Sequence, residues 1–592
     1  MKCWMEELHG LWKNRSYRAA VFLSAVFGYG FFVTHATVGI DDTASAYYFE
    51  DGLAVVVGRW VFFLGNQVVQ VARFAPFLTD LAGVLFLVAG AAVWCLLWKR
   101  IFADKVPLYG YLFFSCLLLT NSLHSEVFPY YLHNGVGLGY LLSGLSLCFF
   151  WEWAGRWTAR AKAARAETKS EAGMEPERRP ETKQAAEPER RPEAKPEAGK
   201  LWKPWLASVV CLWAAIGCYE SFMVVYLAGV CLALCSARLL AAKVKALPSL
   251  AAAAAAAVAA LVLRSLMVAL VVRLFGLESL RGEAVQRSVG EMLDWLLEPG
   301  ALSQLWMFVK RVFVMYGVFA YAYYPVAVYV AAVSGAFFFS IWSSLRRKDP
   351  WIFLFYLGSV AASYLLVLVE GKATYYRSAQ FLPLVSAWGF LLLAYALRGL
   401  GKFPAWAGRR VREALRVGAA VMGAVVVWNQ CADMNRWFYV DYLKYEAAKD
   451  TVRQVAYELE KNFDISKPVI FTGSYQIPKS LVEAAYVGYH TEVFDRMNRL
   501  TTKLDPHLLE KFYREYGVWV AQLPSLSVVD WGISAFGTDR ELIRFFAMHG
   551  YELRAMEDVS AYAEAETSSR GLPSFPEQGS IVDMGAYTIV HF

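Results

Sequence analysis

Blocks of about 20 consecutive apolar residues recur along this 592-residue chain. A helix needs a block of about this length to cross the hydrocarbon core of a bilayer, and lipid offers its backbone no other hydrogen-bond partners. Hydrophobic residues make up 57% of the sequence and charged residues only 18%, which agrees with burial in lipid. The chain is therefore predicted to be a polytopic α-helical membrane protein. About eleven spans are expected, at 19–38, 77–98, 107–123, 132–151, 205–219, 221–241, 248–275, 317–343, 351–369, 380–398 and 415–432.

Lys and Arg residues gather in five segments that flank the expected spans. With a cytoplasmic N-terminus, all five lie on the cytoplasmic side, as the positive-inside rule requires. The outer side then receives 39–76, 276–316 and everything after 433. The formal net charge of +7 is spread over these flanks, so it does not indicate a nucleic-acid partner. The five basic segments are 13–18, 99–105, 238–245, 345–350 and 398–416.

Changes in composition divide the chain into four parts. Residues 1–151 form a first transmembrane block, with the outer loop 39–76, and 205–432 form a second block. Between them, 152–204 is rich in Glu, Arg, Pro and Ala and repeats "EPERRPE", so a disordered cytoplasmic linker is expected. Residues 433–592 are predicted to form a small extracytoplasmic α/β domain.

Local patterns support that C-terminal domain. "KPVIFTG" predicts a buried strand followed by a turn, and "IVDMGAYTIVHF" predicts two paired strands around Met584 and Gly585. The segments 435–463, 505–517 and 538–550 have helical patterns. A Gly-rich phosphate loop is missing from the sequence, which argues against nucleotide binding. The nine cysteines show no CxxC or Cys/His spacing, so neither a zinc site nor a disulfide framework is expected.

The first outer loop, "IDDTASAYYFEDGLAVVVGRW", begins with two adjacent carboxylates, Asp41 and Asp42. A carboxylate at a membrane interface costs little free energy because water is nearby, so a solvated loop is one interpretation. The other is a catalytic site, because the pair directly follows a span and an amphipathic, aromatic stretch follows the pair. Paired carboxylates can also hold a divalent cation. Arg59 and Trp60 close the loop, as interface anchors or as contacts to a donor.

Three further clusters are expected on the same outer face. "NSLHSEVFPYYLHN" carries His124 and Glu126, which fit either a carbohydrate surface or an ordinary interfacial belt. "CYESF" places Tyr219 and Glu220 between two apolar runs, as a functional site or as a tight turn.

The third cluster, "EGKATYYRSAQ", contains Lys372, Tyr376 and Arg377. Cations outside the positive-inside pattern favour an anion, either phospholipid headgroups or a dedicated lipid-phosphate site. Carboxylates, cations and aromatic rings on one outer face are the parts that a sugar transferase with a lipid-phosphate donor needs. A carboxylate takes the acceptor proton, cations stabilise the departing phosphate and aromatic rings stack on sugar.

Three blocks, in order, resemble the Gtr-type glucosyltransferases (type II) of the GT-C superfamily. The block at 39–60 is similar to their first outer loop with its Asp-Asp pair and later Gly-Arg-Trp. "CYESF" resembles their Tyr-Gln/Glu-small-aromatic motif, and 441–473 resembles a helix-then-strand segment of that family.

The resemblance implies a GT-C-like bacterial membrane enzyme with an outer cavity. Its donor would be glucose on polyprenyl phosphate, and its acceptor a cell-surface glycan or lipid-linked glycan. Asp41 or Asp42 would be the base, and Lys372, Arg377 and Arg59 would hold the donor phosphate. The acceptor side would be lined by His124, Glu126, Tyr219, Glu220 and Tyr376. A transporter or flippase of lipid-linked glycans, a glycan polymerase and a non-catalytic surface protein are the alternatives; we find no internal repeat of the kind that transporters show.

Overall fold

The fold is described from a computed structural model of the chain. The described residues are 2–39, 55, 58–69, 75–128, 133–171, 202–242, 244–277, 289–309, 326–370, 378–399, 409–475, 481, 529, 532–533 and 538–592.

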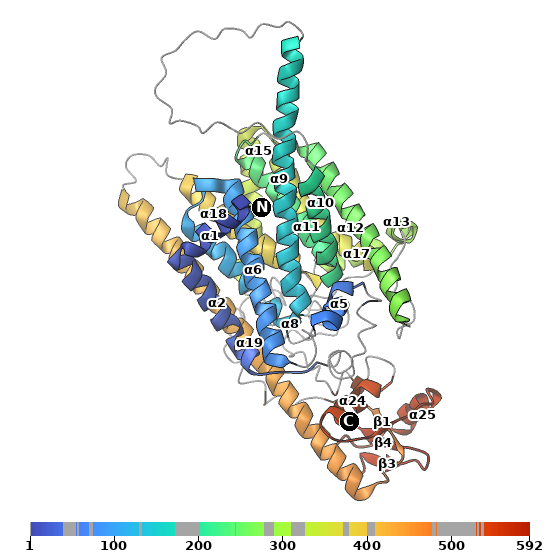
Figure 1. Ribbon diagram of the computed structural model, residues 1–592. Coiled ribbons are helices and arrows are strands. Elements are labelled where there is room, and N and C mark those ends of the chain that lie inside the picture. Colours follow the sequence, from blue (N-terminus) through green and yellow to red (C-terminus); the bar gives the residue numbers. More distant parts are fainter. Residues whose placement is uncertain are drawn as a thin grey trace.

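A bundle of long helices forms most of the molecule (Figure 1). Each of the eleven expected spans overlaps a helix of this bundle. Within the described residues, seven helices are long and apolar enough to cross a membrane, and α7, α10 and α16 are shorter apolar helices. The helices at the expected spans are α2 (Arg15–Thr34), α6 (Pro76–Phe102), α7 (Leu108–Leu119), α9 (His133–Glu171), α10 (Trp202–Cys218), α11 (Phe222–Leu239), α12 (Ala246–Phe275), α15 (Val326–Arg347), α16 (Trp351–Ala361), α18 (Phe381–Gly399) and α19 (Arg409–Asn462).

Short helices complete the bundle. At the N-terminus, α1 is separated from α2 by Asn14, whose side chain accepts a hydrogen bond from the Tyr17 amide and so caps α2. Arg100 of α6 ties α1 to the bundle through an ion pair with Glu7 and by lying over the Trp4 ring. The short helices are α1 (Lys2–Lys13), α5 (Trp60–Val69), α8 (His124–Val127), α13 (Val289–Leu297), α14 (Ala301–Val309) and α17 (Leu365–Glu370).

The prediction of a disordered linker over 152–204 is wrong at both ends. Helix α9 continues to Glu171, and α10 already begins at Trp202. Ala, Arg, Lys and Glu dominate the extension of α9, and these are good helix formers. Glu152 and Arg156 also form an ion pair one turn apart. The repeats at 175–198 lie outside the described residues.

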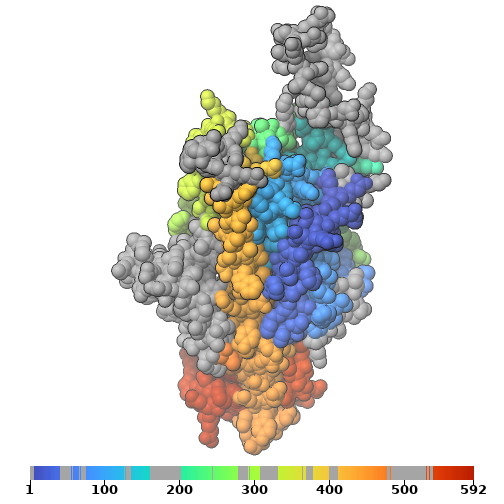
Figure 2. Space-filling view, turned by 90° about the vertical axis from the view of Figure 1, so that its left-hand side faces the viewer, coloured from blue at the N-terminus to red at the C-terminus, as the bar shows by residue number. Residues whose placement is uncertain are grey.

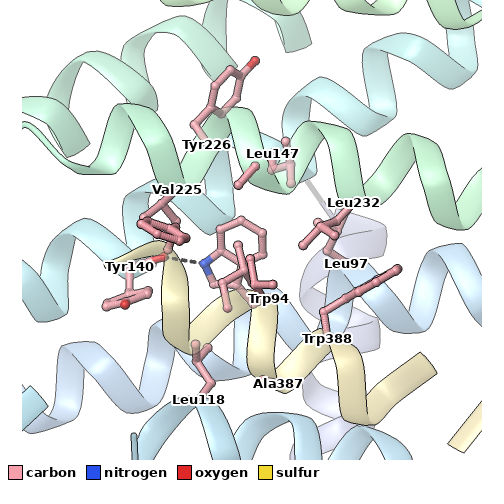
Figure 3. Close-up of a cluster of buried hydrophobic side chains, with 14 of the residues drawn as sticks. Trp94, Leu97, Leu118, Tyr140, Leu147, Val225, Tyr226, Leu232, Ala387 and Trp388 are labelled. Atoms are coloured by element: carbon pink, nitrogen blue, oxygen red, sulfur yellow. Dashed lines mark hydrogen bonds between the residues drawn. The ribbon is translucent and has the colours of Figure 1, made fainter. Parts of the chain in front are cut away.

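Trp94 of α6 lies where three helices meet (Figure 3). Its indole nitrogen donates a hydrogen bond of 3.0 Å to the Tyr140 carbonyl of α9. A Cβ at Gly144 of α9 would lie 3.0 Å from the indole, and one at Gly229 of α11 would lie 2.7 Å from it. The two glycines therefore make the space that the ring fills, and they fix the spacing of α6, α9 and α11.

Glycines also bring α6 and α9 into backbone contact. A Cβ at Gly137 of α9 would overlap the Gly83 carbonyl oxygen, and one at Gly90 of α6 would lie 2.9 Å from the Leu141 amide. Small residues at helix contacts are the usual means of close packing in lipid, where no hydrophobic force drives helices together.

Helix α19 connects the bundle to the C-terminal part of the chain. Its 54 residues correspond to about 80 Å of helix, more than twice the thickness of a bilayer core. It packs along α2 on one face of the molecule, where Phe32 and Phe438 lie 4.9 Å apart between ring centroids (Figure 2). It then runs past the end of the bundle to the strands (Figure 1).

The C-terminal elements that the structure describes form a sheet of four strands in the order β2-β1-β4-β3. The predicted strand at 467–473 is β1 (Pro468–Thr472), which pairs in parallel with β2 (Arg554–Ala555) and β4 (Thr588–His591). The predicted terminal pair is confirmed as the antiparallel β3 (Ile581–Asp583) and β4, with Gly585 at φ +85° in the turn. The helices beside the sheet are α24 (Arg540–Met548) and α25 (Ser560–Ser568), and the helix predicted at 505–517 lies outside the described residues.

Asp539 links this sheet to its helices. The carboxylate is buried and accepts hydrogen bonds from the Phe471 amide at 2.9 Å and from the Tyr562 hydroxyl at 2.6 Å. Burial raises the pKa of the Asp539 carboxyl to about 6, because these hydrogen bonds only partly offset the loss of solvation.

Replacing Gly137 with Ala is expected to loosen the bundle. The added methyl group would overlap the Gly83 carbonyl, so α6 and α9 must separate, at a cost of about 1–3 kcal/mol. Thermal unfolding in detergent measures the effect. Gly155→Ala on the same helix is the control, since a Cβ there meets no atom within 4 Å. Equal melting temperatures for the two variants would contradict the packing argument.

Asp539 is expected to make the C-terminal sheet less stable as pH rises. Its folded pKa of about 6 lies above the ordinary 3.8, so the folded state keeps a proton that the unfolded state releases. The stabilisation is complete below about pH 4 and is lost by about pH 7, up to roughly 3 kcal/mol. Hydrogen exchange of the β1 amides, corrected for intrinsic rates, measures it. The isosteric Asp539→Asn variant has no carboxyl proton to release, so the stability of its sheet should not show this pH dependence. Equal pH dependence in both proteins would refute the prediction.

Candidate functional site

Tyr219 and Glu220 form the turn between α10 and α11. The amides of Phe222 and Met223 donate to the carbonyls of Tyr219 and Glu220 at 3.1 and 3.2 Å. The interpretation of "CYESF" as a tight turn is therefore confirmed. This turn lies at the end of the bundle where α5 and α8 also lie, towards the C-terminal elements (Figure 1).

Arg59 meets this turn from the segment 39–76, 161 residues earlier in the chain. Its Nε and Nη2 donate to the two carboxylate oxygens of Glu220, at 3.4 and 3.3 Å. The guanidinium carbon also lies 4.5 Å from the centre of the Tyr219 ring. A two-point contact with a carboxylate and a cation–π contact together hold a guanidinium in one orientation.

Arg264 of α12 adds a second guanidinium. Its side chain is buried, and its Nε donates to the Gly58 carbonyl at 3.3 Å. Gly58 has φ +90°, and a Cβ there would overlap the guanidinium, so only glycine allows this approach. Arg264 thus holds the peptide immediately before Arg59, and its charge also acts on Glu220.

Trp60 anchors the same loop inside the protein. Its ring stacks on Trp213 of α10, with centroids 4.5 Å apart, and only 7% of the residue is exposed. A Cβ at Gly217 would overlap the ring, so this glycine admits it. The interpretation of Trp60 as a lipid-interface anchor is therefore wrong, because α10 covers the ring.

The two arginines control the charge of Glu220. Partial burial raises the pKa of the Glu220 carboxyl, but the charge and hydrogen bonds of Arg59, with a smaller effect of Arg264, outweigh it. The net pKa lies below the ordinary value, so the group is ionised at neutral pH. About a third of the Glu220 side chain is exposed, against 17% of Arg59.

His124 does not join this cluster. The residue is fully buried, its Nε2 lies 3.0 Å from the Leu118 carbonyl, and its ring packs edge-on against Tyr140. Burial lowers the pKa of His124 to about 4, opposed by the hydrogen bond to Leu118, so the imidazole is neutral. In this structure no surface of His124 is open to a sugar, which corrects its expected place on the acceptor side.

Several of the predicted site residues lie within the described part of the chain. Arg59, Tyr219 and Glu220, expected on the donor and acceptor sides, are brought together in one cluster. Glu126 lies on α8, but its side chain is outside the described part of the chain. The other candidates that lie outside the described residues are Asp41, Asp42, Lys372, Tyr376 and Arg377.

Sequence reasoning missed Arg264, although a signal was present. The residue interrupts an apolar run, "AALVLRSLMVAL", and a charge inside a membrane span is costly unless it has a role. The buried face of α12 includes Ala253, Ala257 and Ala260 and continues through this arginine to Val271.

The cluster of Arg59, Tyr219, Glu220 and Arg264 is suited to binding an anion beside a carboxylate and an aromatic ring. Forked guanidinium donors match phosphate oxygens. Among the described residues, no group of three or more His, Cys, Asp or Glu side chains could hold a metal ion.

Comparison with known proteins places the chain in a family. No curated protein and no solved structure matches it. The family model of the glucosyl transferase GtrII matches residues 30–394, well over half of the chain. The matched range includes the segment 39–76, the α10–α11 turn and α12, whereas the segment 441–473, which also looked similar to the family, lies beyond it. The resemblance to Gtr-type glucosyltransferases is thus confirmed, and the chain belongs to the GtrII glucosyl transferase family.

Proposed function

We propose that this membrane glycosyltransferase moves a hexose, glucose, from a polyprenyl-phosphate donor to a cell-surface or lipid-linked glycan. The reaction would take place on the outer face of a bacterial membrane, within a GT-C-like architecture. The cluster of two guanidiniums, a carboxylate and an aromatic ring, inside the range matched by the glucosyl transferase family, carries the proposal.

Charge must shift from the acceptor to the donor phosphate during such a transfer. The acceptor oxygen bonds to the anomeric carbon, the bond from that carbon to the phosphate oxygen breaks, and a base takes the acceptor proton. Polyprenyl phosphate leaves with additional negative charge. Cations already oriented towards it lower the barrier, because no solvent has to reorganise.

Arg59 and Arg264 are proposed to receive this phosphate, with Lys372 and Arg377 as further cations from the 370–380 segment. Glu220 positions the Arg59 fork, and Arg264 fixes the backbone that carries it. Glu220 was expected to line the acceptor side. Its ion pair with Arg59 suggests instead that it lies where donor and acceptor meet. Tyr219 offers a ring against which a sugar or the Arg59 fork can stack.

Asp41 and Asp42 are proposed to supply the general base. They precede Arg59 in the same outer loop, and an ionised carboxylate can take the proton of an attacking hydroxyl. One Asp would be the base and the other its supporting neighbour.

Asp41→Asn and Asp42→Asn are expected to separate these roles. Loss of a general base reduces transfer by about 10²–10⁴-fold, and loss of a neighbour reduces it less. Transfer from polyprenyl-phosphate-glucose is measured in membranes that contain equal amounts of each protein. Asp104→Asn, an exposed residue in the short helix after α6, is the matched control. Full activity in both loop variants would exclude a catalytic role for the pair.

Arg264→Gln is expected to weaken use of the donor more than use of the acceptor. It removes a buried charge and the hydrogen bond that holds Gly58, so kcat/KM for the donor should fall by about 10²–10³-fold. Steady-state kinetics with each substrate varied in turn measures the split. Arg273→Gln, an exposed arginine nine residues further along α12, serves as control. A loss of the same size for both substrates would contradict a phosphate role.

A further inference from the structure

A polar pocket lies in the C-terminal part of the chain, away from the cluster around Glu220. It is formed between the last turns of α19 and the segment 575–581 that leads into β3, and it has a volume of about 470 Å³. Pockets of about 300–1,000 Å³ are typical of small-molecule sites. Nothing in the proposed transfer chemistry uses it.

Helix α19 presents two different faces at this point. Val452, Val455 and Leu459 are buried in the core beneath the sheet. Gln454, Tyr457, Glu458 and Asn462 recur at helical spacing on another face and line the pocket. The apolar face fixes the helix, so the polar face is held in place independently of any ligand.

The lining of the pocket is rich in hydrogen-bonding groups and contains no Lys, Arg or His. Amides come from Gln454 and Asn462 of α19 and from Gln578 of the loop, and carboxylates come from Glu458 and Glu577. Two carboxylates without a lining cation disfavour phosphates and acidic sugars. Amides and carboxylates are instead the partners that sugar hydroxyls need, since these both donate and accept.

Two details favour a sugar over a cation. The Asn462 amide donates to the Glu458 carboxylate at 2.7 Å, which orients that carboxylate as a directed acceptor. Tyr457 is 59% exposed at the rim, and the Lys461 ammonium lies 5.6 Å from the centre of its ring. The exposed part of the ring, beside directed polar groups, suits the apolar face of a pyranose. Within the described residues, moreover, no cluster of three metal-ligating side chains was found.

We propose that this pocket binds a neutral oligosaccharide segment of the acceptor glycan, remote from the transferred sugar. The inference rests on the proposed glycosyl transfer for the identity of the ligand. Helix α19 is continuous from the bundle to the pocket, so a glycan bound there is tethered to the membrane part of the same molecule (Figure 1). Tethering raises the effective concentration of the acceptor without any contact at the reacting atoms.

Binding is tested without donor, on the full chain in lipid nanodiscs, by saturation-transfer NMR. The probes are neutral trisaccharides of glucose, galactose and N-acetylglucosamine, with trigalacturonate as the charged comparison. At least one neutral probe should bind and trigalacturonate should not. Tyr457→Ala and Gln578→Ala, both changes of exposed side chains, should each weaken binding at least 5-fold. Arg453→Gln is the control, because its side chain on α19 is 67% exposed and outside the pocket.

The proposal is overturned if no neutral probe binds, if trigalacturonate binds equally well, or if both pocket variants bind like the control. These outcomes are independent of the proposed transfer. A chain that binds neutral probes through the pocket but transfers no glucose would refute the proposed function alone. A chain that transfers glucose with unchanged acceptor KM in both pocket variants would refute the pocket alone.

Discussion

Close contact between α6, α9 and α11 is the constraint on which the rest of the structure depends. In lipid, apolar surface alone does not hold helices together, so the contact must come from shape. Gly144 and Gly229 have no side chains, which leaves room for the Trp94 ring, and Gly137 allows the backbone of α6 to approach α9 closely. Because α11 begins at the Tyr219–Glu220 turn, the position of that turn follows from this packing.

The charged cluster uses the rigidity that the bundle provides. Arg59 comes from a loop, yet it is fixed on four sides: by Glu220, by the Tyr219 ring, by the Trp60 stack on Trp213, and by Arg264 through Gly58. Buried charges are retained in apolar surroundings only when they are paired and hydrogen-bonded. The arrangement accordingly brings together residues from three separate segments of the chain, all of them within the range matched by the GtrII family.

Helix α19 joins the helical bundle to the C-terminal sheet. One stretch of it packs on α2 within the bundle, and another supplies the core of the C-terminal sheet through Val452, Val455 and Leu459. The family match ends at residue 394, before this helix begins. The proposed transfer site and the proposed glycan pocket therefore lie in different parts of the chain that one continuous helix joins.

Sequence alone determined the helical membrane architecture, because lipid permits few alternatives and apolar length is a local property. It also determined the strands β1, β3 and β4, through short apolar runs and the turn at Gly585, and it indicated the family. Tertiary structure alone decided which charges meet. Arg59 and Glu220 are 161 residues apart, and no local pattern encodes their contact. It likewise enclosed His124 and gave Arg264 its partner, because burial and pairing depend on neighbours that are distant in sequence.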